Sequence, residues 1–208
     1  MNNSTYPKII LALEIVALSL TGVFNQAGWG IWTLEVFPAV LGTFVLIITY
    51  RKFRFSNLVY TLLFLQSLVL MYGGMYTYAL TPFGDWVSEM LDWTRNNYDK
   101  LGHFMQGFTP VLVLREIFIR KEIVRGKGWL AFISVLVVLG LSAFYEFIEW
   151  GIALMSDEVG DAFLGTQGYI WDTQSDMLMC LIGSIIALIF LAKLHNRSMS
   201  KLEAGHGV

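Results

Sequence analysis

The sequence predicts an all-α membrane protein, a bundle of about six transmembrane helices with one short helix lying in the outer interface of the membrane. Two observations predict this class. Of the 208 residues, 56% are hydrophobic and only 14% are charged, values outside the usual range for a soluble globular domain. The apolar residues also gather into six segments that meet or approach the roughly 20 residues needed to cross a bilayer.

The six apolar segments use most of the chain and predict a single integral membrane domain over residues 1–208. They cover residues 9–25, 31–50, 57–80, 100–119, 129–154 and 174–194. The first is expected to be a retained helix, because Glu14 interrupts its apolar run and no small-residue cleavage site follows it. The single cysteine, Cys180, lies in the last segment and excludes an intrachain disulfide.

The distribution of basic residues predicts the orientation. With six spans, 12 of the 14 Lys and Arg residues fall on one side of the membrane, and only Arg95 and Lys100 fall on the other. Cytoplasmic loops carry an excess of Lys and Arg, so we expect both termini in the cytoplasm. The net charge of −2 gives no indication of a nucleic-acid partner, and membrane lipids are the expected surroundings.

The outer side carries acidic and aromatic connections. In the stretch "FGDWVSEMLDWTRNNY", apolar side chains recur at helical spacing, which predicts a short amphipathic helix in the interface. The last outer connection, residues 155–173, contains three glycines and no long apolar run. We expect it to form a structured loop or a re-entrant turn.

Polar residues of the last three predicted spans converge at one depth, near the outer surface. They are Asp99, Lys100, His103 and Gln106 of the fourth segment, Ser142, Glu146 and Glu149 of the fifth, and Asp172 and Asp176 of the sixth. Glu35, Tyr76 and Tyr78 lie at a similar depth. A charge at the centre of a span costs about 2.5–3.5 kcal/mol. Their convergence therefore predicts a site.

The predicted site has more carboxylates than cations. Only Arg95, Lys100 and a protonated His103 lie close enough in the sequence to balance them. Carboxylates held close together cannot all stay ionised, so either several are protonated or a bound cation neutralises them. Carboxylates with one imidazole suit Zn²⁺, Mn²⁺ or Mg²⁺. The candidate ligands of a divalent metal ion are His103, Glu146, Glu149, Asp172 and Asp176.

The same residues include candidates for general acid and base chemistry, which needs positioned groups of tuned proton affinity. The candidate catalytic residues are His103, Asp99, Glu146 and Asp176, and the further binding residues are Glu149, Asp172, Gln106, Tyr76 and Lys100. Structural roles are the alternative, since Asp99 and Asp172 can satisfy helix N-termini and Lys100 can extend toward the interface. Glu14 and Glu116 are expected near the cytoplasmic interface, with no special role.

Five stretches resemble the YjdF-like family of bacterial inner-membrane proteins, a family of unknown function. They are "GGMYTYA", "YDKLGHFMQGFTP", "REIFIRK", "SAFYEFIEW" and "GDAFLGTQGYIWDTQSDM", and the resemblance covers about residues 30–195. It implies a multi-pass protein of the bacterial inner membrane and no particular activity. Where that family often shows histidine, this chain has Met75, which leaves His103 as the single imidazole candidate.

The chain is also loosely similar to VanZ-like membrane proteins. The similarity rests on an Asp-Lys-x-x-His start at Asp99, Lys100 and His103, followed by a later glutamate and a final helix with Asp172, Asp176 and Gly183. It implies at most a relative that acts on or near cell-envelope lipids or glycans.

Three functions stay open from the sequence. The leading hypothesis is an outer-facing pocket that binds a divalent cation or performs acid–base chemistry on an envelope lipid or glycan. The first alternative is a small ion- or proton-coupled transporter, although the cytoplasmic halves of the last three spans offer few polar residues beyond Ser134 and Ser184. The second is a structural or partner-binding protein with a hydrogen-bonded polar core. Neither catalysis nor the oligomeric state follows from the sequence.

Overall fold

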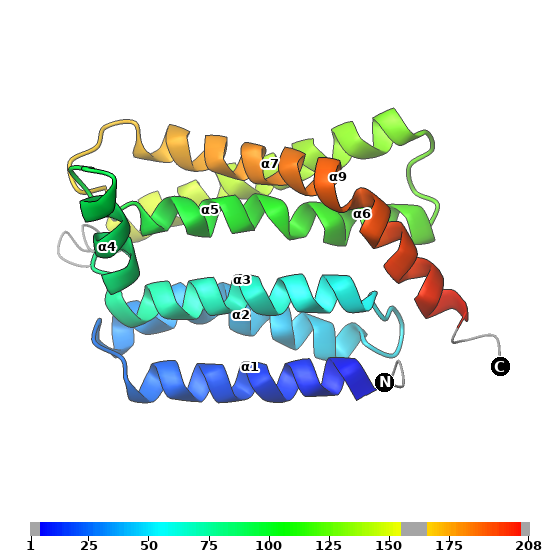
Figure 1. Cartoon of the computed structure of the whole chain (residues 1–208), viewed down its shortest axis with the longest axis horizontal. Coiled ribbons are helices and arrows are strands. Elements are labelled where there is room, and N and C mark those ends of the chain that lie inside the picture. The colour runs from blue at the N-terminus through cyan, green and yellow to red at the C-terminus, as the bar shows by residue number, and fades with distance from the viewer. Residues whose placement is uncertain (1–4, 155–165, 205–208) are drawn as a thin grey trace.

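The computed structural model describes residues 5–154 and 166–204, and over these ranges it is helical with no β-strand. The helices are α1 (Thr5–Val23), α2 (Trp29–Thr49), α3 (Asn57–Tyr76), α4 (Pro82–Met90), α5 (Tyr98–Phe108), α6 (Pro110–Arg120), α7 (Lys127–Ala153) and α9 (Asp172–Ala204). All except α4 run roughly along the length of the bundle (Figure 1). The predicted fold class, a polytopic membrane helix bundle, is confirmed. Most of the connection expected to be a loop or re-entrant turn lies outside the described residues.

Five helices of the described chain are long and apolar enough to cross a membrane, namely α1, α2, α3, α7 and α9. The fourth predicted span is instead divided between α5 and α6, which have 11 residues each. They join through Thr109, whose backbone is helical, and Pro110 begins α6. Proline has no N–H to donate to the carbonyl of the preceding turn. The two helices lie end to end and together run the length of the bundle (Figure 1).

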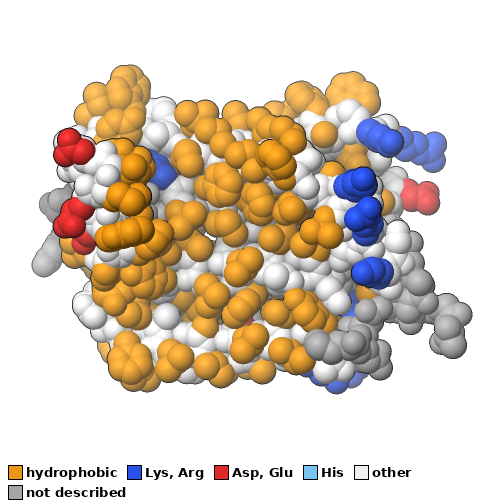
Figure 2. Space-filling model, in the orientation of Figure 1, with side chains coloured by type: hydrophobic (Ala, Val, Ile, Leu, Met, Phe, Trp, Pro, Cys, Tyr) orange, Lys and Arg blue, Asp and Glu red, His pale blue; other side chains and the backbone are white. Residues whose placement is uncertain are grey.

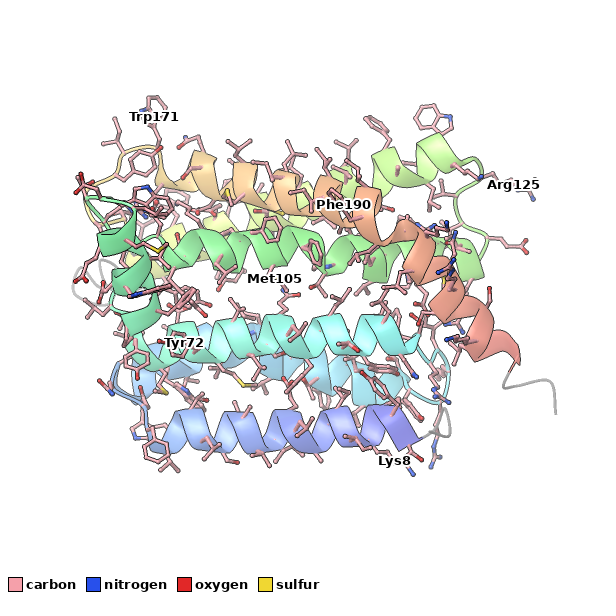
Figure 3. The ribbon with its side chains drawn as sticks, viewed as in Figure 1. Lys8, Tyr72, Met105, Arg125, Trp171 and Phe190 are labelled. Carbon is pink, nitrogen blue, oxygen red and sulfur yellow. The ribbon has the colours of Figure 1, made fainter. Side chains whose placement is uncertain are left out.

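Charged residues separate the two ends of the bundle. In Figure 2, Lys and Arg side chains gather at one end, most of the visible Asp and Glu side chains at the other, and a broad hydrophobic band lies between them. We call these the basic end and the acidic end. Lys8 and Arg125 mark the basic end, and Tyr72 and Trp171 mark the acidic end (Figure 3). The described parts of α1 and α9 begin and finish, respectively, at the basic end (Figure 1).

The amphipathic helix predicted in the interface is α4, which lies across the acidic end at a steep angle to the other helices (Figure 1). Its apolar side chains Phe83, Trp86 and Met90 are exposed. A helix that turns large apolar side chains outward at the edge of a hydrophobic band is suited to the membrane interface.

Among the described helices, α5 and α9 make the most extensive contact, and two glycines make their close approach possible. A Cβ atom on Gly107 would overlap the backbone carbonyl of Cys180 in α9, and one on Gly183 would overlap that of Phe104 in α5. Small residues of this kind let helix backbones approach closely in membranes. The contact joins the second half of α5 to α9 and so holds the two helices together next to the predicted site.

Candidate functional site

The turn before α5 is held rigidly and directs Arg95 toward α9. The Asn96 side chain donates to Asp85 Oδ1 at 2.8 Å and accepts from the backbone N–H of Tyr98 at 3.0 Å. The Gln167 amide exchanges hydrogen bonds with the Asn96 backbone, at 3.1 and 2.7 Å. The neighbouring Arg95 then forms an ion pair with Asp172, with 2.9 Å between Nη2 and Oδ1.

Lys100 lies between the two aspartates of α9. Its Nζ atom is 2.6 Å from Asp172 Oδ1 and 2.6 Å from Asp176 Oδ1, and 3.5 Å from Asp99 Oδ2. The lysine therefore points into the protein and does not extend toward the interface. With Arg95, it supplies two fixed positive charges to the α9 aspartates.

His103 lies one turn deeper, between the helices. Its Nε2 atom is 3.3 Å from Asp99 Oδ1 and 3.8 Å from Asp176 Oδ1. On the other side of the ring, Nδ1 is 3.0 Å from Gln106 Oε1 and 3.8 Å from Glu146 Oε1. Oxygen atoms thus surround both ring nitrogens, an arrangement that favours a proton or a metal ion on the imidazole.

A cavity of about 90 Å³ lies beside His103. Its walls come from α2, α3, α5 and α7, and the chain just after α3 completes them. The lining residues are Glu35, Pro38, Gln66, Leu70, Tyr78, Asp99, Gly102, His103, Gln106, Tyr145 and Glu149. Three carboxylates and one imidazole therefore line one small cavity.

Several polar atoms around this cavity lack partners. The side-chain oxygen of Gln66 and Oε1 of Glu146 are buried and make no hydrogen bond within the described chain. No Lys or Arg of residues 5–154 and 166–204 lies within ion-pair distance of Glu35, Glu146 or Glu149. Buried polar groups are normally paired, so each exception calls for an explanation.

The structure brings most of the predicted site residues together. Asp99, Lys100, His103, Asp172 and Asp176 form one group of ion pairs. Gln106 and Glu149 line the cavity, and Glu146 lies behind His103. The oxygen of Gln106 is also 3.4 Å from the Ser142 hydroxyl.

Tyr76 is the predicted site residue that the structure places neither among the ion pairs nor on the cavity wall. Its ring packs edge-on against Tyr72, with centroids 5.3 Å apart, and Tyr78 lines the cavity instead. The reason is the turn after α3, where Thr77 and Tyr78 adopt positive φ angles of 66° and 48° and fold the Tyr78 ring back onto Gly73.

Gln66 and Tyr145 also line the cavity, and the sequence reasoning did not select them. For Gln66, the available signal was an amide side chain in the middle of the mostly apolar third segment. Tyr145 precedes Glu146 in "SAFYEFIEW", but helix position alone did not show which way its ring faces.

The expectation that Glu116 needs no special role was wrong. Glu116 is fully buried at the basic end. Its carboxylate accepts hydrogen bonds from Ser56 N and Ser56 Oγ at 2.8 and 2.7 Å, is 2.9 Å from His195 Nε2, and pairs with Arg120 at 2.8 Å. We call these four residues the Glu116 cluster.

The fold and the site together define a multi-pass membrane protein with a buried carboxylate and histidine cluster near one end of its helices. The chain belongs to the family described as "Predicted membrane protein (DUF2238)", which matches residues 7–197. It is 45% identical over 196 residues to the "Inner membrane protein YjdF" of Escherichia coli (strain K12), covering 92% of this chain and 94% of the relative. The family resemblance seen in the sequence is confirmed. No solved structure matches at a significant level.

Proposed function

We propose that this protein binds a divalent metal cation in the cavity at the acidic end, with Asp99 and His103 as its central ligands. Asp99, His103 and Asp176 each offer a ligand atom, and these atoms lie within 4.8 Å of one another. Glu35 and Glu149 supply further carboxylates from the cavity wall. Oxygen and imidazole ligands of this kind suit Zn²⁺, Mn²⁺ or Mg²⁺.

The distribution of charge is the observation that carries this proposal. Arg95 and Lys100 are both held by the α9 aspartates, while the glutamates of the cavity have no such partner among the described residues. A divalent cation in the cavity would neutralise these carboxylates where protein cations do not. Its arrival would also give the unpaired Gln66 oxygen a neighbour of opposite charge.

Two of the five predicted metal ligands, Asp172 and Glu146, are not ligands in this proposal. Asp172 is held by Arg95 and Lys100, so a metal ion at that carboxylate would have to compete with two fixed charges. We assign Asp172 to anchoring Lys100, and Glu146 to contact with the imidazole. The proposed ligand set therefore centres on Asp99, His103, Asp176, Glu35 and Glu149.

The test is metal binding by the purified full-length protein, titrated separately with Zn²⁺, Mn²⁺ and Mg²⁺ in a calorimeter. We expect one site per chain for at least one of the three ions. We also expect Asp99→Asn and His103→Gln to weaken binding by about tenfold or more, since removing a ligand is at least as costly as removing a residue that orients one. Glu89→Gln, an exposed change at the same end, should leave affinity unchanged.

The proposal is wrong if wild type binds none of the three ions, or if the Asp99 and His103 variants bind as tightly as wild type. Because a metal displaces protons from its ligands, the affinity should also rise with pH. A flat affinity between pH 6 and about 8, where ligand protonation ordinarily competes, would point to adventitious surface binding instead.

The second candidate is acid–base chemistry on an envelope lipid or glycan, and the His103–Asp99 pair on the cavity wall favours it. A carboxylate beside an imidazole nitrogen, here at 3.3 Å, orients the ring and stabilises its protonated form. Mass spectrometry of envelope lipids and glycans, from cells expressing wild type or His103→Gln, distinguishes the two candidates. A product lost in the variant, with no metal bound by wild type, would favour catalysis.

The proposed orientation places the basic end in the cytoplasm and the acidic end outside. It is supported by the gathering of Lys and Arg side chains at one end of the bundle (Figure 2), because cytoplasmic loops carry such an excess. A reporter fused to the C-terminus tests it. Fluorescence from a cytoplasmic reporter is expected, and activity of a periplasmic reporter would reverse the assignment.

A further inference from the structure

A second cavity, of about 220 Å³, lies between α1, α2 and α3 toward the basic end. It is lined by Pro7, Lys8, Ile10, Leu11, Glu14, Thr43, Leu46, Ile47, Tyr50, Tyr60, Leu63, Phe64 and Ser67. None of these residues belongs to the proposed metal site. Most of the lining is apolar, and the few polar groups include one carboxylate.

The packing of the first three helices explains why this cavity exists. Both α1 and α2 pack against α3, but they make little contact with each other. A gap therefore remains between α1 and α2 above the surface of α3. Lys8 and Ile47, on either side of it, are exposed, so the cavity reaches the surface that faces lipid.

Two charged residues line this cavity, Glu14 and the exposed Lys8. Glu14 forms no ion pair among the described residues. Its side chain is buried, with 6% of its surface exposed. The Thr43 hydroxyl donates to it over a long distance, 3.4 Å from Oγ1 to Oε1, and the Ser67 side chain is its other hydrogen-bond partner. A carboxylate at this depth in a span is costly, and such residues usually mark a binding site or a path for ions or substrates.

Tyr60 provides an independent observation. Its side chain is 5% exposed, and its hydroxyl group is buried without a hydrogen-bond partner in the described chain. Because Tyr60 lines the same cavity as Glu14, a donor or acceptor on a bound molecule would satisfy it. The aromatic rings of Tyr50, Tyr60 and Phe64 add surfaces that attract cations.

We propose that this cavity binds a hydrophobic organic amine, with its ammonium group at Glu14 and its apolar body along α2 and α3. A purely apolar molecule would leave the carboxylate and the Tyr60 hydroxyl unpaired, and an inorganic cation would leave the apolar walls unfilled. A protonated amine on a hydrocarbon body matches both. It reaches the cavity from the lipid, between α1 and α2.

The test compares two molecules of nearly the same shape, 4-phenylbutylamine and pentylbenzene, on the purified full-length protein in detergent. The first carries an ammonium group where the second carries a methyl group. We expect wild type to bind the amine about tenfold more tightly than the hydrocarbon, the scale of a single well-placed charge interaction. Equal affinities would mean that a neutral chain occupies the cavity, and the proposal would be wrong.

Variants locate the interaction. Glu14→Gln keeps the size of the side chain and should abolish the preference for the amine, while the affinity for pentylbenzene stays the same. Tyr60→Phe removes only the unpaired hydroxyl and should weaken amine binding about fivefold, the usual scale of one hydrogen bond. Glu89→Gln, exposed on α4, is the control and should retain the preference.

An unchanged preference in Glu14→Gln overturns the proposal. If Glu14→Gln does not fold, the wild-type comparison and Tyr60→Phe still decide, because neither depends on that variant. Removal of Asp99 and His103 does not touch this cavity, so loss of metal binding and loss of amine binding are separate results.

Discussion

The Glu116 cluster at the basic end and the polar groups around His103 at the acidic end differ in how completely they are paired. At the basic end, each carboxylate oxygen of Glu116 has two partners, from Ser56, His195 and Arg120, and neither Glu116 nor His195 has any exposed surface. At the acidic end, Glu146 and Gln66 retain buried atoms without partners, and a cavity lies beside His103.

At the basic end, the hydrogen-bond partners of His195 also fix which of its ring nitrogens carries a proton. Arg115 approaches His195 Nδ1 at 3.1 Å, and arginine can only donate. His195 Nδ1 is therefore the acceptor, and its Nε2–H donates to Glu116. His103 has oxygen atoms near both nitrogens and no such fixed assignment. The comparison teaches that burial of a charged group and completeness of its pairing are separate properties, because both groups are buried and only the Glu116 cluster is fully paired.

The largest expected effect is at the basic end, with Glu116→Gln. The change leaves Arg120 without its charged partner and breaks the hydrogen bonds of a fully buried group. Loss of one member of a buried pair costs about 3–5 kcal/mol, so the free energy of unfolding should fall by that amount, measured by denaturant unfolding in micelles. A fall no greater than that of Glu89→Gln would show that the Glu116 cluster contributes little to stability.

A smaller loss of stability is expected from a substitution at the contact between α5 and α9. Gly183→Val places side-chain atoms against the Phe104 carbonyl, and overpacking of this kind costs about 1–3 kcal/mol. It should also move Asp176 of α9 away from Asp99 and His103 of α5, and so weaken metal binding. Gly140→Val, at a position with open space around it, is the matched control. If the two variants lose equal stability, the close approach of α5 and α9 is not the cause of the loss.

The smallest effect has the opposite sign. Glu35→Gln removes one buried carboxylate from the cavity, where like charges crowd without a protein cation. We expect the metal-free protein to gain stability, by about 0.5–2 kcal/mol, the scale of a single stabilising substitution. Thermal unfolding with and without a chelator measures it. A loss of stability would place Glu35 with Glu116 as a fully paired structural residue.

The fold was predictable because it depends on composition along the chain. Apolar segments long enough to span a bilayer, and an amphipathic stretch between two of them, were sufficient to predict the membrane helices and α4. The length of α9 was not, since the sequence beyond residue 194 becomes polar while the helix continues to Ala204.

The grouping of the candidate site residues was predictable to the level of helix faces and depth, and the structure places Asp99, His103 and Asp176 close together. Which groups pair was not predictable, because pairing depends on how neighbouring helices are rotated. Two examples are the contact of Lys100 with Asp172 and the contact of Glu116 with His195. Each joins residues more than 70 positions apart in the sequence. Tyr78 lines the cavity in place of the predicted Tyr76 because the chain after α3 makes a left-handed turn at non-glycine residues. Sequence patterns do not indicate such a turn.

The contact between α5 and α9 has a consequence for biosynthesis. Chains are made from the N-terminus, so α5 leaves the ribosome well before α9. Until Asp172 and Asp176 arrive, Lys100 has only Asp99 of its three carboxylate partners, and α5 on its own is short and charged. The insertion of α5 should therefore be completed late, with a chain truncated before α9 leaving this segment poorly integrated in the membrane.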